Sequence, residues 1–155
     1  MRAVICTVAA AALLLAAPVA IAHQGNPNYR SVVSKVTPDV PGIKVSVLNF
    51  DDRLLLHNTS GQDVVIYDYA DPPRPYARLM ADGTVEVNRN SEAYYLNEDR
   101  YGETSVPKNL PEEPQWEQVS RSSRFEWHDH RAHWMGKGDP PGLKDKSKRQ
   151  KLNDW

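Results

Sequence analysis

Short runs in which apolar and polar residues alternate are the clearest regularity of the chain. Ile43, Val45 and Val47 occupy every second position of the first run, with Lys44 and Ser46 between them. Because successive side chains of a strand point to opposite faces, this pattern predicts a strand with one buried face. Similar short runs predict six further strands, at residues 53–57, 64–67, 76–80, 84–87, 116–119 and 124–128.

Turn-forming residues separate the predicted strands. Asp51-Asp52 ends the first run, residues 58–61 (Asn-Thr-Ser-Gly) end the second, and Asp82-Gly83 lies between the runs 76–80 and 84–87. An Asp-Gly pair between two strands is typical of a tight hairpin. Turn signals every eight to twelve residues or so are typical of a sandwich. We therefore predict a mostly β protein with an immunoglobulin-like antiparallel β-sandwich.

Other stretches carry weaker structural signals. Residues 88–102 contain Tyr94, Tyr95 and Tyr101 without a clean period, which predicts an ordered loop in which the tyrosines pack. Further strands are predicted to begin at Val106 and to span residues 152–155. The chain has 12 prolines, and these disfavour helix because the proline ring removes a backbone donor.

The first 22 residues have the composition of a secretory signal peptide. Arg2 supplies a positive charge, residues 3–17 are almost wholly apolar, and Ala20-Ile21-Ala22 places small residues where a signal peptidase reads them. We predict cleavage after Ala22 and a secreted or extracytoplasmic location. The alternative is an uncleaved membrane anchor, since the apolar run approaches spanning length. The predicted organisation is a signal peptide (1–22), a β-sandwich domain (23–142) and a basic tail (143–155).

Charge and composition narrow the functional classes. The net charge of −1 gives no global field that would attract nucleic acid. The only cysteine is Cys6, inside the predicted signal, so the mature domain has neither a disulfide nor a thiolate ligand. No nucleophile elbow, phosphate-binding loop or dinucleotide fingerprint is present, and we predict that the protein is not an enzyme. Lysines and arginine in residues 143–155 suit a peripheral contact with anionic lipid.

The stretch 125–135, FEWHDHRAHWM, holds three of the five histidines. In an extended chain His128 and His130 lie on one face about 6.6 Å apart, close enough to converge on one ion. His133 and Met135 follow after a predicted bend. Imidazole and thioether ligands together favour copper.

His23 adds a second argument for copper. As the first residue of the mature chain it would offer its α-amine and a ring nitrogen to one ion, and one further histidine would complete a histidine brace. This arrangement resembles the copper sites of certain periplasmic copper carriers and oxidative polysaccharide-cleaving enzymes, which are also β-sandwiches. The resemblance is limited to the terminus and the fold class. The predicted metal ligands are His23, His128, His130, His133 and Met135, with copper as the candidate cofactor.

An alternative interpretation of the histidine stretch needs no metal. The three histidines then serve as hydrogen-bonding groups of a polar core between Trp127 and Trp134. In the copper hypothesis Glu126 and Asp129 orient the imidazoles from outside the site; in the alternative these carboxylates bond the rings directly. His57, in an alternating strand before a turn, is predicted to be a surface residue.

Four motifs resemble an uncharacterised family of secreted or membrane-anchored actinobacterial proteins. The motifs are GNPN (25–28), VLNFDDR (47–53), YYLNEDRYG (94–102) and FEWHDHRAHWMGKG (125–138). The match covers most of the mature chain, and the family has no known function. The resemblance implies that members continue past Trp155 with more strands and a membrane helix, so this chain is expected to be a shortened sandwich without its C-terminal strands and anchor.

Two functional hypotheses follow from the sequence. The first is an exported cell-envelope protein that binds copper through His23 and the histidine–methionine stretch. The second is a structural or protein-interaction domain of the envelope that binds no metal. In both, the expected partner is an envelope protein or polymer and not nucleic acid.

Overall fold

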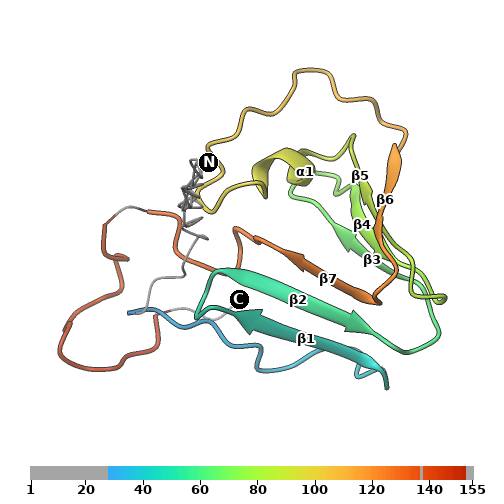
Figure 1. Ribbon diagram of the computed structural model, residues 1–155. Coiled ribbons are helices and arrows are strands. Elements are labelled where there is room, and N and C mark those ends of the chain that lie inside the picture. The colour runs from blue at the N-terminus through green and yellow to red at the C-terminus, as the bar shows by residue number, and fades with distance from the viewer. Residues whose placement is uncertain (1–27, 137, 153–155) are drawn as a thin grey trace, which may run out of the picture.

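The computed structural model describes residues 28–136 and 138–152, and there the chain is mostly β. The elements, in chain order, are β1 (Ile43–Leu48), β2 (Arg53–Asn58), β3 (Val64–Tyr67), β4 (Pro75–Leu79), β5 (Val85–Asn88), α1 (Glu92–Leu96), β6 (Trp116–Ser120) and β7 (Arg124–Trp127). They form two antiparallel sheets, consistent with a β-sandwich (Figure 1). This confirms the predicted mostly β class and all seven main strands. The immunoglobulin-like topology stays a prediction.

The strand order explains how distant segments meet. One sheet has the order β1-β2-β7 and the other has the order β3-β4-β5-β6. The chain crosses from the first sheet to the second after β2 and returns after β6, so that β7 pairs with β2. The end of β7 is thereby brought beside the start of β2, where Leu54 lies opposite Trp127.

The predicted alternation sets which side chains are buried. In β1, Ile43 and Val45 are half-buried and pack against the core, whereas Lys44 and Ser46 are exposed. The buried apolar core consists of Leu56, Tyr76, Ala77, Leu79, Val85, Val87, Ala93 and Trp127. Asn58 helps to join the two sheets, because its Nδ2 donates to the Leu79 carbonyl of β4 at 3.2 Å.

The Asp82-Gly83 hairpin between β4 and β5 is confirmed. Gly83 has a φ of +87°, a left-handed conformation that glycine adopts without a steric penalty. The Met80 N–H donates to the Thr84 carbonyl at 2.8 Å, which closes the turn. The Thr84 N–H also donates to the Asp82 carboxylate at 2.9 Å.

Two of the weaker predictions differ from the structure. The sequence predicts a loop for residues 88–102, but α1 forms within them because Ser91 caps the helix and Ala93 is buried. No strand begins at Val106 in the described chain, where Pro107 follows and has no N–H for a ladder. Leu152 is not in a strand either, and residues 153–155 of the predicted final strand lie outside the described residues.

The predicted tyrosine packing holds in part. Tyr94 packs against the core and meets Tyr95 edge-on, whereas Tyr101 is 44% exposed.

The predicted signal peptide and His23 lie outside the described residues. Within residues 28–136 and 138–152, no helix is both long and apolar enough to cross a membrane.

Candidate functional site

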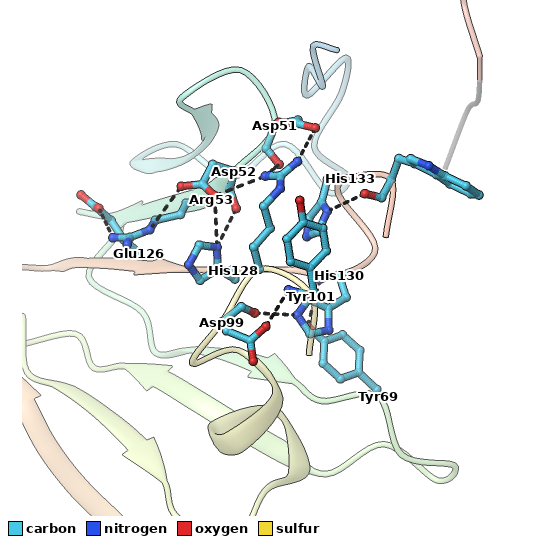
Figure 2. Close-up of polar contacts among 12 residues, drawn as sticks. Asp51, Asp52, Arg53, Tyr69, Asp99, Tyr101, Glu126, His128, His130 and His133 are labelled. Carbon is cyan, nitrogen blue, oxygen red and sulfur yellow. Dashed lines mark hydrogen bonds and ion pairs between the residues drawn. The ribbon is translucent and has the colours of Figure 1, made fainter. Parts of the chain in front are cut away.

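Three segments that are far apart in the sequence meet at one end of the sandwich. The β1–β2 turn contributes Asp51 and Asp52, the segment after α1 contributes Arg100, and the segment after β7 contributes three histidines (Figure 2). We call Asp51, Asp52, Arg100, His128, His130 and His133 the histidine–arginine cluster. Its members come from three segments of the sequence, residues 47–53, 94–102 and 125–138, so these segments form one spatial group.

Arg100 joins the cluster to the β1–β2 turn. Its Nη2 lies 2.7 Å from Asp51 Oδ2, and its Nη1 lies 3.2 Å from Asp52 Oδ1. The arginine is only 5% exposed and each aspartate 1% exposed. Burial by itself lowers the pKa of Arg100, but the hydrogen bonds and charges of Asp51 and Asp52 outweigh this effect, and the pKa is raised. The guanidinium therefore remains a cation paired with buried carboxylates.

The local backbone turns both aspartates inward. Asn49 and Phe50 have φ values of 48° and 71°, a left-handed conformation that is uncommon for residues other than glycine. The Asp52 N–H then donates to the Leu48 carbonyl at 3.1 Å. As predicted, Asp51-Asp52 forms a turn, but one whose carboxylates are buried.

His128 is held by the same turn. Its Nδ1 lies 3.0 Å from the Asp52 carbonyl oxygen and 3.5 Å from Asp52 Oδ1. Alternation along the predicted strand 124–128 places His128 on the outer face with Arg124 and Glu126, but this prediction is wrong, because His128 is only 4% exposed. The regular strand ends at Trp127, so the alternation of faces does not continue to His128.

His130 points to a different partner. Its Nε2 lies 3.1 Å from the Asp99 carbonyl oxygen, and its ring stacks on Tyr69 with centroids 5.7 Å apart. Gly102 makes room for this ring: a Cβ there would lie 2.7 Å from His130 Cε1. Gly102 also has a φ of +65°, so any larger residue would meet both steric and backbone penalties.

His133 has one ring nitrogen in a hydrogen bond and one without. Its Nδ1 lies 3.2 Å from the Trp134 carbonyl oxygen. The buried Nε2 has no hydrogen-bond partner among the described residues. Burial lowers the pKa of His133, although the hydrogen bond to Trp134 opposes this effect. The neutral imidazole is therefore favoured.

The structure brings the three histidines into one region without directing them at one point. His128 and His130 bond carbonyls of different segments, and Figure 2 shows their rings turned toward these separate partners. The His130 and His133 rings meet edge to face with centroids 5.8 Å apart. Met135 is half-buried in the following loop. In the described chain, no group of three or more His, Cys, Asp or Glu side chains is placed to hold a metal ion.

The two acidic residues of the stretch are engaged elsewhere. Glu126 lies 3.9 Å from Arg53 across the sheet. Asp129 accepts from Trp127 Nε1 at 2.9 Å and from Arg131 Nε and Nη2 at 2.9 and 2.8 Å. Neither of these contacts involves a histidine. The bonds of Glu126 and Asp129 therefore do not orient the imidazoles as predicted.

The Asp129 contacts predict acid sensitivity. Burial alone would raise the pKa of Asp129, but hydrogen bonds from Arg131 and Trp127 lower it overall. A carboxylate whose pKa is lower in the folded state adds stability above its unfolded pKa of about 3.9, and this stability is lost as pH falls toward the folded pKa. We expect Asp129→Asn to flatten the fall in the free energy of unfolding below pH about 4. Urea unfolding at several pH values measures this.

The matched control for this experiment is Asp39→Asn, which removes an exposed carboxylate from a loop. The slope of its acid limb should stay close to that of the wild type. If Asp129→Asn and the wild type lost stability in parallel over the whole range, the carboxylate of Asp129 would not be a source of acid sensitivity.

Sequence reasoning did not identify Asp51, Asp52 and Arg100 as part of the site. Asp51-Asp52 has the composition of an ordinary turn, and Arg100 lies in the irregular segment 88–102. Nothing in the sequence alone indicates that the segments that carry these residues meet the histidine stretch.

The comparisons with known proteins return no relatives. No protein-family model matches the chain, and searches of the curated proteins and of the solved structures find no match.

Proposed function

We propose that the protein is an exported, non-enzymatic domain of the cell envelope that binds another envelope component, with the histidine–arginine cluster as its structural polar core. The observation that carries this proposal is the pairing of buried Arg100 with Asp51 and Asp52, which ties the segment after α1 to the β1–β2 turn. His128 ties the segment after β7 to the same turn. A group that joins three segments in this way supports a role in holding the fold.

The burial of the cluster favours this role over catalysis. Arg100, His128 and His133 are each at most 5% exposed. A catalytic group must reach a substrate directly or through one water. Buried charged groups that are paired and hydrogen-bonded are instead typical of a structural network.

Export and an envelope partner are supported by the sequence. Residues 1–22 have the composition of a signal peptide, and an immunoglobulin-like sandwich would suit an exported binding domain. The basic tail would contact anionic lipid with a reduced charge, because Lys146 pairs with Asp139 and Lys148 lies 3.2 Å from Asp145.

Copper binding is the second candidate function, and one atom favours it. His133 Nε2 is buried without a hydrogen-bond partner among the described residues, and its ring lies beside that of His130. An unpaired buried imidazole nitrogen is a free ligand position. The complete candidate set is His23, His128, His130, His133 and Met135.

A Cu(II) titration separates the two candidates. The protein beginning at His23 is compared with a version that carries one extra residue before His23, and with His133→Gln. The polar-core proposal predicts no binding tighter than that of a short histidine-containing peptide in any of the three. Tight one-to-one binding that the extension weakens would support the brace. Tight binding that only His133→Gln weakens would place copper in the 125–135 stretch, and either result would contradict a purely structural cluster.

A further inference from the structure

The exposed aromatic side chains of the described residues all lie at one end of the sandwich. Three of them, Phe50, Tyr101 and Trp134, are each next in sequence to a member of the histidine–arginine cluster. The fourth, Tyr67, ends β3, and its carbonyl accepts from Arg131 Nη2 at 3.5 Å. We call Phe50, Tyr67, Tyr101 and Trp134 the aromatic end. Exposed apolar side chains that gather in one region mark a contact with a partner.

Hydrogen bonds join the segments that carry these aromatic residues. The Ser31 N–H donates to the Phe50 carbonyl at 2.9 Å, and Ser31 Oγ donates to the Ala132 carbonyl. The β1–β2 turn is thereby joined to the segment after β7. Arg100 Nη1 lies 3.3 Å from the Asp51 carbonyl oxygen, which brings the segment after α1 to the same turn. These segments meet where β1 ends and β2 begins (Figure 1).

Phe50 is the member of the aromatic end that the fold itself explains least. Its φ of 71° lies in the left-handed region, where a bulky residue is an outlier. The side chain is 54% exposed, so little burial offsets the backbone strain. Asparagine or glycine would form the same turn at a lower cost. Strained residues cluster at contact sites for ligands and partners, and this favours a binding role for the aromatic ring.

Trp134 is exposed but held in one orientation. Its Nε1 donates to the Gly138 carbonyl at 2.7 Å. The ring packs on Gly136, where a Cβ would lie 2.5 Å from Trp134 Cζ2. A side chain that is already fixed in the free protein loses little conformational entropy when a partner covers it.

The placement of the aromatic end favours a broad surface over a small ligand. Small-molecule sites are concave, and two grooves of about 660 and 680 Å³ lie beside β1. None of the four residues of the aromatic end lines either groove. Tyrosine and tryptophan have an apolar ring and a polar tip, which suits them to the interface between the lipid tails and the water.

The basic tail lies at the same end of the sandwich (Figure 1). The Tyr29 hydroxyl donates to Asp139 Oδ1 at 3.1 Å, so the tail adjoins the chain that leads to Ser31. Residues 138–152 contain five lysines and arginines and two aspartates, a net charge of +3. Lys144 and Arg149 are in no ion pair within the described part of the chain. Their positive charge complements an anionic bilayer surface.

We propose that the aromatic end binds the interface of a lipid bilayer that contains anionic lipid. This inference rests on the proposed function as a binding domain of the envelope, and it names the bilayer as the component bound. The aromatic rings enter the headgroup region, and the tail attracts anionic headgroups. Exposed Glu98 and Glu103 lie close to Tyr101 in sequence, so the attraction to anionic lipid comes from the tail and not from the segment after α1.

Vesicle sedimentation tests this proposal. The protein beginning at His23 is mixed with sucrose-loaded vesicles of phosphatidylcholine, alone or with about 30% phosphatidylglycerol, and the bound fraction is measured after centrifugation. Without residues 1–22, binding cannot come from their apolar run. We expect binding to both kinds of vesicle, at least about tenfold tighter when anionic lipid is present.

Phe50→Asn should change two properties in opposite directions. It removes an aromatic ring and should weaken vesicle binding about tenfold or more. The melting temperature should stay the same or rise, because asparagine adopts the left-handed conformation more readily than phenylalanine. The matched control is Val119→Asn in β6, an end strand of the other sheet, where the side chain is 49% exposed. It should leave vesicle binding unchanged.

A charge-reversed tail separates the two parts of the contact. Lys144→Glu together with Arg149→Glu should remove most of the preference for anionic vesicles. Binding to vesicles of phosphatidylcholine alone should stay close to that of the wild type, because the aromatic end is unchanged.

Several outcomes would overturn the proposal. They are no binding to either kind of vesicle at millimolar lipid, an equal loss of binding in Val119→Asn, or a lower melting temperature with unchanged binding in Phe50→Asn. Binding to anionic vesicles that Phe50→Asn does not weaken would assign the contact to the tail alone. None of these results bears on the Cu(II) titration, so this inference and the polar-core proposal can fail separately.

Discussion

Replacing Arg100 with methionine is expected to lower the free energy of unfolding by about 3–5 kcal/mol, measured by urea unfolding at neutral pH. Arg100 is 5% exposed and contacts both Asp51 and Asp52. Without the guanidinium, two carboxyl groups that are 1% exposed lose their cationic partner in a medium that solvates charge poorly. The loss is large because charge is left uncompensated, and not because the ion pair is itself strongly stabilising.

Two further variants isolate this cause. Arg100→Lys keeps the positive charge but lacks the planar fork that reaches two carboxylates, so we expect a smaller loss of about 1–3 kcal/mol. Adding Asp51→Asn and Asp52→Asn to Arg100→Met removes the buried charge and should recover part of the loss. A triple variant less stable than Arg100→Met would contradict this account, as would a loss below about 1 kcal/mol for Arg100→Met, the size typical of an exposed pair.

Replacing Trp127 with alanine is expected to lower the free energy of unfolding by about 3–5 kcal/mol. The side chain is 7% exposed, and its ring stacks on Phe125 with centroids 5.6 Å apart. Its Nε1 also donates to Asp129 at 2.9 Å. The substitution therefore leaves a cavity in the core and removes a donor from a buried carboxylate.

Trp127→Phe is the less disruptive variant. It keeps one aromatic ring in the core but removes the N–H donor and part of the indole volume, so we expect a smaller loss of about 1–3 kcal/mol. Thermal and urea unfolding of both variants give the comparison. Equal losses would mean that the retained phenyl ring adds no packing stability over alanine, and a loss below about 1 kcal/mol for Trp127→Ala would mean that the ring is not packed as the structure places it.

The strands could be predicted because their signals are local. In β1, Ile43, Val45 and Val47 are each two positions apart, and the Asp82-Gly83 turn is encoded within residues 80–84. Neither signal depends on a distant part of the chain. The short helix α1 was missed because its stability comes from the Ser91 cap and the burial of Ala93, and five residues give no detectable helical period.

The site could be predicted only in part. The sequence pointed to the histidines, since they lie within one short stretch. It could not show that His128 bonds the Asp52 carbonyl, a residue 76 positions away, because that contact depends on the pairing of β7 with β2. The outward direction predicted for His128 was wrong because side chains alternate only within a regular strand, and β7 ends one residue before His128.

The long sequence separations within the cluster have a consequence for folding kinetics. Arg100 is 49 residues from Asp51 and 48 from Asp52, so these pairs form only after large loops have closed. Contacts that are absent from the folding transition state affect mainly the rate of unfolding. If the cluster assembles after that barrier, Arg100→Met accelerates unfolding and leaves the refolding rate almost unchanged. The cluster then determines how long the native state persists once it has formed.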